Sequence, residues 1–460
     1  MQDDQAASAP FLKALRSRLE ETQTTYVRCN FIDYLGIARG REVSSDYLLR
    51  NSQRGIALAP VNYTLDIGDV DYDRRYGPEA GDFYLVPDLD SFVVLPYLSG
   101  IAHVFGDLES IDGTPWPGCS RQALKRIEAL AEKELGVVSM GFEQEGFLMR
   151  KGPKGYRPAS DFKHHTFEFF DVHQAFMTEL LAVLQQLGTP VDKMSLEDGH
   201  GEIELNTTAS TPLVASEQYF RLKQAFRFIA RKHGFVGSFM PKPFDDIAGA
   251  GLHLHLSIRD SSGIQAFADS GSPDHHGLSE TARHFIGGLL RHAEALVALG
   301  CPTVNSYKRL RPGVFAPTHA AFGIGNRSAM VRVIRNAAGT GPDPNQHIEV
   351  RTADGTCNPH LFAAAVLAAG LDGVRLRTEP TAPIGDDLGL MTEDALAAAE
   401  IRGLPSNLGE ALGALDKDLE IRAALGDEVV DGFLRVKRIE WSKYNAHVSD
   451  WEHLHYAEFF

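Results

Sequence analysis

The sequence has few cysteines, and their spacing matches no motif of paired cysteines. Its four cysteines, Cys29, Cys119, Cys301 and Cys357, lie far apart and form no CxxC pair. This spacing favours neither a zinc knuckle nor a disulfide framework. Separate reduced thiols are typical of a protein of the cytoplasm, which is where we expect this one.

Basic charge and long apolar runs are also scarce. Lys and Arg number 45 against 61 Asp and Glu, which gives a net charge of −16. Because phosphate backbones recruit basic surfaces, this balance argues against a nucleic-acid partner. No run approaches the ~20 apolar residues that a membrane helix needs. The first residues, MQDDQAASAP, are acidic and polar where a secretory signal is basic and then apolar, so we expect no membrane partner.

The chain also lacks a GxxxxGK[ST] loop, so a nucleotide would have to be held by metal ions and arginines. A basic segment that could do this runs from residue 305 to 336. Solvated surface charge is the alternative explanation, but arginines beside a metal suit phosphoryl transfer, in which charge spreads over the phosphoryl oxygens. The basic residues of this segment are Lys308, Arg309, Arg311, Arg327, Arg332 and Arg335.

The length of 460 residues, 43% of them hydrophobic, is enough for two domains with sizeable cores. Apolar periodicity predicts a helix over residues 11–21, and a strand follows over 25–33. A strongly periodic helix is predicted to begin at Ser120 as its N-cap. We therefore expect a small α+β domain over residues 1–112 and a larger domain over 113–460.

Acidic residues recur on the predicted strands of the larger domain. In GFEQEGFLM, Glu143 and Glu145 share one face because side chains alternate along a strand. A solvated edge would explain this pair alone. The segment LEDGHGEIELN adds Glu197, Glu202 and Glu204, the last two again on one face.

Two further strands carry histidine, serine and arginine opposite an apolar face. In GAGLHLHLSI, leucines alternate with His253, His255 and Ser257, and in HIEVRTAD apolar residues alternate with Glu349 and Arg351. A lone histidine in such a strand would more often be structural. Four strands of this design could line one cavity, however. Gathered carboxylates with an occasional imidazole favour Mg²⁺ or Mn²⁺, while zinc is less natural among so many oxygens.

At these residues the sequence resembles type I glutamine synthetase, in order along nearly the whole chain. The motifs that carry the resemblance are FEQEGF, EDGHGEIE, GAGLHLHLS, NSYKRLRPG, NRSAMVR, EVRTADGTCNPHLFAAAVLAAGLDG and the ending WEHLHY. The resemblance implies an α+β fold. It has a small β-grasp-like N-terminal domain and a large catalytic domain, whose antiparallel sheet forms a partial barrel flanked by helices.

The resemblance also implies roles for individual residues, with two or more Mg²⁺ or Mn²⁺ ions per site. One ion would be held by Glu145, Glu197 and Glu204, and the other by Glu143, His253 and Glu349. The residues that resemble the ATP-binding set are His255, Ser257, Arg327 and Arg332. Those that resemble the glutamate-binding set are Gly249, Arg309 and Arg351, and the catalytic pair would be Arg327 and Arg351.

The family reaction would run through γ-glutamyl phosphate. The γ-carboxylate of glutamate attacks the γ-phosphate of ATP, and an amine then attacks the acyl phosphate, while metals and arginines stabilise the oxygens. Family members form rings in which the active site lies between the small domain of one subunit and the large domain of its neighbour. A homo-oligomer, a dodecamer of two hexameric rings, is therefore the expectation.

The sequence departs from the family pattern where ammonia would bind. The flap reads PGVFAP, with Phe315 at the place of a glutamate, and IALAPVNYTLDIG contains no match to the family's DGSS-like aspartate. An apolar ring can pack against the carbon skeleton of a larger amine or offer it a π face. Phe315 and Phe322 mildly favour an apolar acceptor pocket, and Asp66 and Asp69 are candidate amine bases.

The sequence thus predicts an ATP-dependent glutamate–amine ligase. Its acceptor would be a polyamine, ethanolamine or another alkyl or aryl amine. A true glutamine synthetase that uses ammonia is the first alternative. A non-catalytic family member with a structural or regulatory role is the second, although such a protein has no need to carry the mutual repulsion of the gathered metal ligands.

Overall fold

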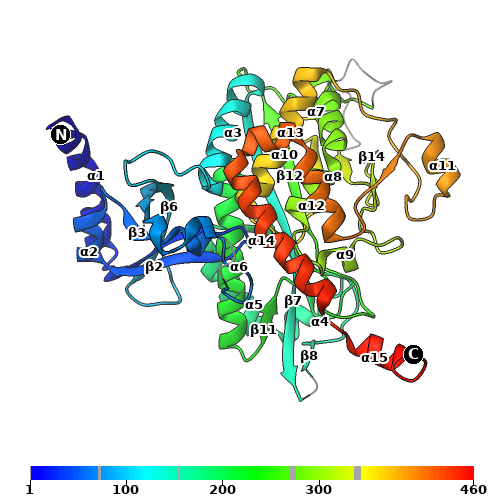
Figure 1. The fold of residues 1–460 in the computed structure, drawn as a ribbon, viewed down its shortest axis with the longest axis horizontal. Helices are drawn as coiled ribbons and strands as arrows, with labels where there is room; N and C mark the ends of the chain where they lie inside the picture. Colours follow the sequence, from blue (N-terminus) through cyan, green and yellow to red (C-terminus); the bar gives the residue numbers. More distant parts are fainter. Residues whose placement is uncertain (1, 71–73, 154, 270–275, 336–342) are drawn as a thin grey trace.

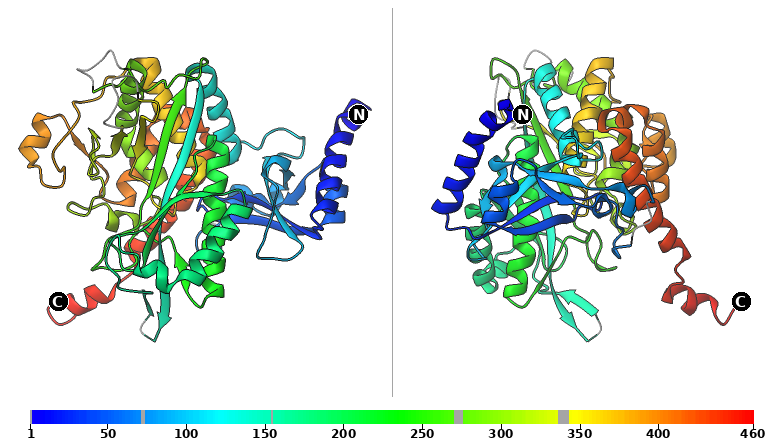
Figure 2. Two further views of the ribbon diagram at one scale, coloured as in Figure 1. Left: turned by 180° about the vertical axis from the view of Figure 1, so that it is seen from behind. Right: turned by 60° about the vertical axis from the view of Figure 1, so that its left-hand side comes forward.

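The computed structural model describes residues 2–70, 74–153, 155–269, 276–335 and 343–460. It has a small N-terminal unit, on the left of Figure 1, and a larger unit built on a strongly curved sheet with helices against it. This confirms the expected mixed α+β fold, with a barrel-like sheet flanked by helices in the larger part. Figure 2 shows both termini projecting from the body.

In its described residues the N-terminal unit has a six-stranded sheet, two α-helices and four short 3-10 helices. Strands β1 and β6 pair in parallel and the other described pairs of this sheet are antiparallel, in the order β2-β1-β6-β4-β3 with β5 beside β6. The elements are α1 (Gln2–Glu21), β1 (Tyr26–Ile32), β2 (Ala38–Ser44), α2 (Ser45–Asn51), β3 (Ile56–Leu58), β4 (Phe83–Pro87), β5 (Val93–Val94) and β6 (Ile101–Glu109).

The larger unit is built on a nine-stranded sheet with the order β14-β15-β16-β12-β7-β10-β9. The long strand β7 pairs with β12, β10, β8 and β11, so it is the central strand of the sheet. The strands are β7 (Val137–Gly152), β8 (Gly155–Pro158), β9 (Val191–Leu196), β10 (Glu202–Thr207), β11 (Val236–Ser238), β12 (Leu252–Arg259), β14 (Phe322–Ile324), β15 (Val331–Ile334) and β16 (His347–Val350). A separate two-stranded sheet pairs β13 (His319–Ala320) with β17 (Arg402–Gly403).

Helices cover the apolar face of this sheet and form the core with it. The buried side chains Leu252, Leu254 and Leu256 of β12 belong to the same core cluster as the apolar residues of α10. The helices are α3 (Ser120–Leu135), α4 (Glu168–Val172), α5 (Gln174–Gln186), α6 (Pro212–Lys232), α7 (Glu280–Arg291), α8 (Ala293–Gly300), α9 (Ser306–Arg309), α10 (Pro359–Leu376), α11 (Glu393–Ala398), α12 (Leu408–Lys417), α13 (Leu419–Leu425), α14 (Asp427–Ala446) and α15 (Asp450–Tyr456).

The start of helix α3 differs from what the sequence suggested. The N-cap of α3 is Cys119, and Ser120 is the first helical residue. The hydroxyl of Ser120 is instead 2.7 Å from the hydroxyl of Tyr63 in the N-terminal unit, so it ties the two units together. Helix α10 is long and apolar enough to cross a membrane by length and composition, yet 78% of it is buried inside the protein. It is therefore a core helix.

Candidate active site

The four expected strands lie side by side in the centre of the sheet and place their polar side chains on one face. Antiparallel register sets Glu145 of β7 opposite Glu204 of β10, and it sets Glu143 opposite His253 of β12. On the other side of β12, His255 lies opposite Glu349 of β16. The strands thus bring together acids and imidazoles that are more than 200 positions apart in the chain.

Direct contacts hold these groups in place. Nδ1 of His253 lies 2.6 Å from Oε1 of Glu143 and 3.3 Å from Oε1 of Glu349. Glu349 is fully buried and pairs with Arg332 at 3.0 Å and with Arg351. Burial alone would raise the pKa of Glu349, but Arg351, His253 and His255 lower it below its ordinary value.

The acids divide into two electrostatic classes. Burial would raise the pKa of Glu143, but His253 and His255 outweigh it and hold the carboxyl ionised. Burial and then the charges of Glu143, Glu197 and Glu145 raise the pKa of Glu204 to about 8. Carboxylates under such repulsion are relieved by a divalent cation.

The residues present therefore fit divalent metal ions. Glu143, Glu145 and His253 offer ligand atoms within 4.8 Å of one another, and so do Glu143, His255 and Glu349. The second group makes His255, which was expected to contact ATP, a candidate metal ligand as well. Oxygen atoms with few imidazoles suit hard cations.

Two cavities meet at this face of the sheet. The larger, of about 1010 Å³, is lined by all four residues of the expected ATP set, His255, Ser257, Arg327 and Arg332. The smaller, of about 810 Å³, is lined by Gly249, Arg309, Arg351 and Phe315, together with the acids Glu145 and Glu197. Both cavities share a wall made of Glu143, His165, Glu197, Glu204 and Arg327.

The wall of the smaller cavity is fixed by the backbone. Arg309 is buried, and its Nη2 donates to the carbonyl oxygens of Thr352 at 2.6 Å and Ala353 at 2.8 Å. A Cβ atom on Gly249 would lie 2.4 Å from the carbonyl oxygen of Pro241 and 3.0 Å from the Arg309 side chain. Only glycine therefore fits here, and the backbone of residue 249 is left open to the cavity.

Phe315 lies at the mouth of the smaller cavity. Its side chain is 73% exposed, and its backbone has φ of 52°, a left-handed conformation that is uncommon outside glycine. Phe322 does not join it. That side chain is buried in β14 within the main core, so its expected contribution to an acceptor pocket is wrong.

Asp66 and Asp69 lie in the N-terminal unit and line neither cavity of the chain. Asp66 is 2.5 Å from Nζ of Lys443 and accepts N–H groups of Gly68 and Val70. Burial would raise its pKa, but these partners outweigh it and lower the pKa, which makes a weaker base. Asp69 pairs with Arg39 at 2.6 Å. A role for either in amine binding stays a prediction that requires a neighbouring subunit.

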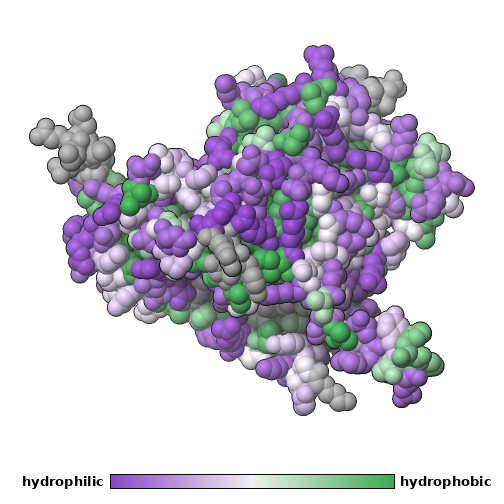
Figure 3. Space-filling view, viewed as in Figure 1, coloured by the Kyte–Doolittle hydropathy of each residue, from purple (hydrophilic) through white to green (hydrophobic). Residues whose placement is uncertain are grey.

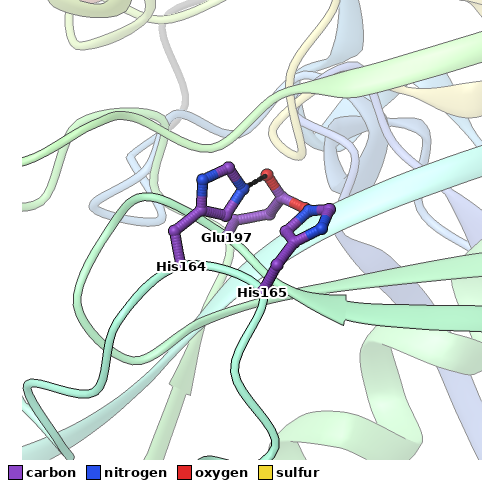
Figure 4. A group of neighbouring side chains, drawn as sticks. All are labelled: His164, His165 and Glu197. Atoms are coloured by element: carbon purple, nitrogen blue, oxygen red, sulfur yellow. Dashed lines mark ion pairs between the residues drawn. The ribbon is translucent and has the colours of Figure 1, made fainter.

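Sequence reasoning missed two histidines beside Glu197. His164 and His165 lie on a loop between β8 and α4, and Figure 4 shows both rings next to the Glu197 carboxylate. Strand alternation gives the direction of a side chain, but a loop has no such period. The only signal in the sequence was the consecutive HH itself.

Comparison with known proteins decides the family. The model of the glutamine synthetase N-terminal domain matches residues 7–116, and that of the glutamine synthetase catalytic domain matches residues 117–456. The chain belongs to the glutamine synthetase family. It is an ATP-dependent ligase that forms carbon–nitrogen bonds.

Relatives of this glutamine synthetase-family chain carry two different names. A glutamate–methylamine ligase of Methyloversatilis universalis is 36% identical, over 96% of this chain and 98% of the relative. A glutamine synthetase of Halobacterium salinarum is 34% identical, over 97% of both. A solved structure described as a GmaS/ADP complex superimposes with a TM-score of 0.84 at 30% identity, over 96% of this chain and 99% of the other.

Proposed function

We propose that the protein joins the γ-carboxylate of L-glutamate to an amine larger than ammonia. The observation that carries this proposal is Phe315, an aromatic side chain at the mouth of the smaller cavity, where the family resemblance expects a glutamate. The flap residues 311–317 contain no acid that could stabilise an ammonium ion by charge. The relative named as a glutamate–methylamine ligase supports the same direction.

The cavity chemistry suits an amine that arrives as a cation with a carbon skeleton. Asp198, Asp245 and Asp246 are exposed acids that line the cavity, attract a protonated amine and can accept the proton that it must lose before its nitrogen attacks. Phe315 then packs against its carbon atoms. A polyamine, ethanolamine or another alkyl or aryl amine fits this description. The exposed carboxylates could also pair with the second ammonium group of a diamine.

ATP then occupies the larger cavity, glutamate and the amine share the smaller one, and the reacting atoms meet at the shared wall. ATP occupies the larger cavity with its phosphates toward Arg332 and Arg327, and glutamate occupies the smaller one against Gly249 and Arg351. Arg327 borders both cavities, so its guanidinium can stabilise the phosphoryl oxygens in the transfer and in the attack of the amine. Nε of Arg351 donates to the carbonyl oxygen of Arg327 at 3.0 Å, which fixes the Arg351 side chain against the backbone of Arg327.

Mg²⁺ or Mn²⁺ would be held by Glu143, Glu145, Glu197, Glu204, His253 and Glu349. When bound, these ions neutralise phosphate charge and polarise the phosphoryl and carboxylate oxygens. We also propose that the protein acts in the cytoplasm as a homo-oligomer of two hexameric rings. In support, helix α15 projects from the body and carries exposed apolar side chains, among them Trp451 and Leu454.

The test is phosphate release with glutamate, ATP and Mg²⁺ across methylamine, ethanolamine, putrescine, aniline and ammonium. We expect an organic amine to give the highest kcat/KM. Reactions without glutamate measure ATP hydrolysis that is not coupled to ligation and serve as the control. If ammonium gives the highest kcat/KM, the amine assignment is wrong and the protein is a glutamine synthetase in activity as well as in family.

A further inference from the structure

The two histidines next to Glu197 have no part in the reaction proposed above. Nε2 of His164 lies 3.6 Å from Oε2 of Glu197, and Nε2 of His165 lies 3.6 Å from Oε1. The two rings face each other edge to face with centroids 4.1 Å apart. Each imidazole therefore approaches a different oxygen of the same carboxylate (Figure 4).

Each separation is longer than a hydrogen bond and close to the distance between two ligand atoms on one metal ion. A nitrogen–oxygen hydrogen bond closes to about 2.7–3.2 Å. Ligand atoms on a tetrahedral cation with bonds of about 2.0–2.2 Å lie about 3.4 Å apart. An octahedral cation with bonds of about 2.0–2.1 Å would bring them to about 3.0 Å. Ligand atoms of all three side chains lie within 4.8 Å of one another.

The backbone and a neighbouring hydroxyl hold this arrangement. His165 has φ of 56°, in the left-handed region that few residues other than glycine adopt. Its N–H donates to the carbonyl oxygen of Leu196 at 3.0 Å, directly before Glu197 in the chain. The hydroxyl of Ser195 donates to Oε1 of Glu197 at 2.9 Å and orients the carboxylate, as supporting groups around metal ligands do.

We propose that His164, His165 and Glu197 bind a divalent transition cation of the zinc type. Two imidazoles and one carboxylate select such a cation over Mg²⁺, which prefers oxygen ligands. The histidine side chains are 49% and 63% exposed, so the fourth position of a tetrahedral ion opens toward solvent and the cavities. This site differs in ligand type from the oxygen-rich groups around Glu143. It shares Glu197 with the proposed Mg²⁺ set, because the two oxygen atoms of one carboxylate can bridge two cations, and it would fill whichever amine the protein uses.

The test is a zinc titration of the full-length protein in saturating Mg²⁺, against a chromophoric chelator. We expect the double variant His164→Gln with His165→Asn to bind one tight zinc equivalent per chain fewer than the unchanged protein. Asparagine is chosen at 165 because it tolerates the left-handed backbone. His276→Gln is the matched control, because His276 is exposed with the same φ of 56° but belongs to no metal-binding group of the described residues. Equal zinc counts in all three proteins would overturn the proposal.

A second measurement does not depend on the folding of a variant. Crystals of the unchanged protein are soaked in Zn²⁺ with excess Mg²⁺, and anomalous scattering locates the zinc. A peak between the rings of His164 and His165 and the Glu197 carboxylate supports the site. Zinc bound only at the group of Glu143, Glu145 and His253 contradicts it.

Discussion

Phe315 is the residue on which acceptor choice depends most. A carboxylate at this position would face the cavity mouth and stabilise a small cation by charge, while removing the apolar surface that a larger amine contacts. We therefore expect Phe315→Glu to raise kcat/KM for ammonium relative to methylamine by about tenfold or more, on the basis of about 1–3 kcal/mol for such a pocket contact. Phe315→Leu keeps the pocket apolar and is the control. An unchanged preference in Phe315→Glu would show that the side chain does not reach the acceptor.

The raised pKa of Glu204 predicts how stability depends on pH and on metal. Its ordinary pKa of 4.5 in the unfolded chain becomes about 8 in the fold. The neutral form is favoured in the fold, so this contribution is fully present below pH 4.5 and is lost as pH rises through about 8. Without metal the melting temperature should fall across this window. Mg²⁺ should raise it more at pH 8 than at pH 6, as measured by differential scanning fluorimetry with and without EDTA. An equal Mg²⁺ effect at the two pH values would contradict the assignment.

For single residues, the sequence predicted well the face of a strand on which a side chain lies, because alternation along the strand sets that face. Glu143, Glu145 and Glu204 face one cavity because their strands bury the opposite faces. Alternation does not tell how deeply a side chain is buried, however. The sequence therefore did not show that Phe322 lies in the core. The direction of loop side chains such as His164 depends on contacts that no local pattern encodes.

Among the elements, helix α3 is tied to both units by one buried arginine. Arg121 pairs with Asp88 and Asp107 at 2.7 Å in the N-terminal unit and with Glu217 of α6 at 2.9 Å. Replacing it by methionine leaves Glu217 as a buried charge without its main partner, so we expect a loss of about 3–5 kcal/mol in the free energy of unfolding.

The neighbouring Lys125 offers a matched control for this prediction. Lys125 also pairs with Asp107, at 2.6 Å, but its side chain is 43% exposed. Lys125→Met should therefore cost no more than about 1 kcal/mol. The measurement is guanidinium unfolding followed by fluorescence and circular dichroism. Equal losses in the two variants would mean that burial does not set the cost.

A buried histidine joins three helices and should make their packing pH-dependent. His292 is the N-cap of α8. Its Nδ1 lies 2.7 Å from Oδ2 of Asp418, the N-cap of α13, and its Nε2 lies 3.0 Å from Oδ2 of Asp372 in α10. Burial would lower its pKa, but the two carboxylates outweigh it and raise the pKa above 6.5. Its stabilising contribution is present below pH 6.5 and is lost as pH rises through the raised value. His292→Gln should remove this part of the pH dependence, as measured by thermal unfolding between pH 6 and 9. A profile unchanged by the substitution would disprove the link.

Element types were predictable where periodicity was strong, as in α3 and β12, but strand order was not. The register that places Glu143 opposite His253 joins segments over 100 residues apart. The N-cap of α3 was misassigned because Ser120 uses its hydroxyl for Tyr63, a tertiary contact that no local rule reveals.

At the scale of the whole molecule, the C-terminal segment projects from the body with its apolar side chains exposed. Figure 3 shows hydrophobic side chains gathered on this projection, at the lower right. The exposed residues are Val448, Trp451, Leu454, Tyr456, Phe459 and Phe460. Apolar surface of this kind marks an interaction site, and the proposed ring assembly supplies an occupant.

Deleting residues 447–460 should therefore reduce the mass of the assembly in solution. We expect full-length protein to form a large oligomer by mass photometry and the shortened chain to form smaller species. Trp451→Ser with Leu454→Ser tests the same surface without removing the segment. If the shortened chain forms an assembly with the same number of subunits as the full-length protein, the segment is not an assembly contact.

The wall shared by the two cavities has a consequence for the economy of ATP use. On the proposed route an acyl phosphate forms beside Arg327, which already borders the cavity where the amine waits. The activated intermediate never has to diffuse through bulk water, where it would hydrolyse unproductively. Leakage is then governed by the mouth of the smaller cavity, so the side chain that selects the amine also limits how many ATP molecules are wasted for each amide made.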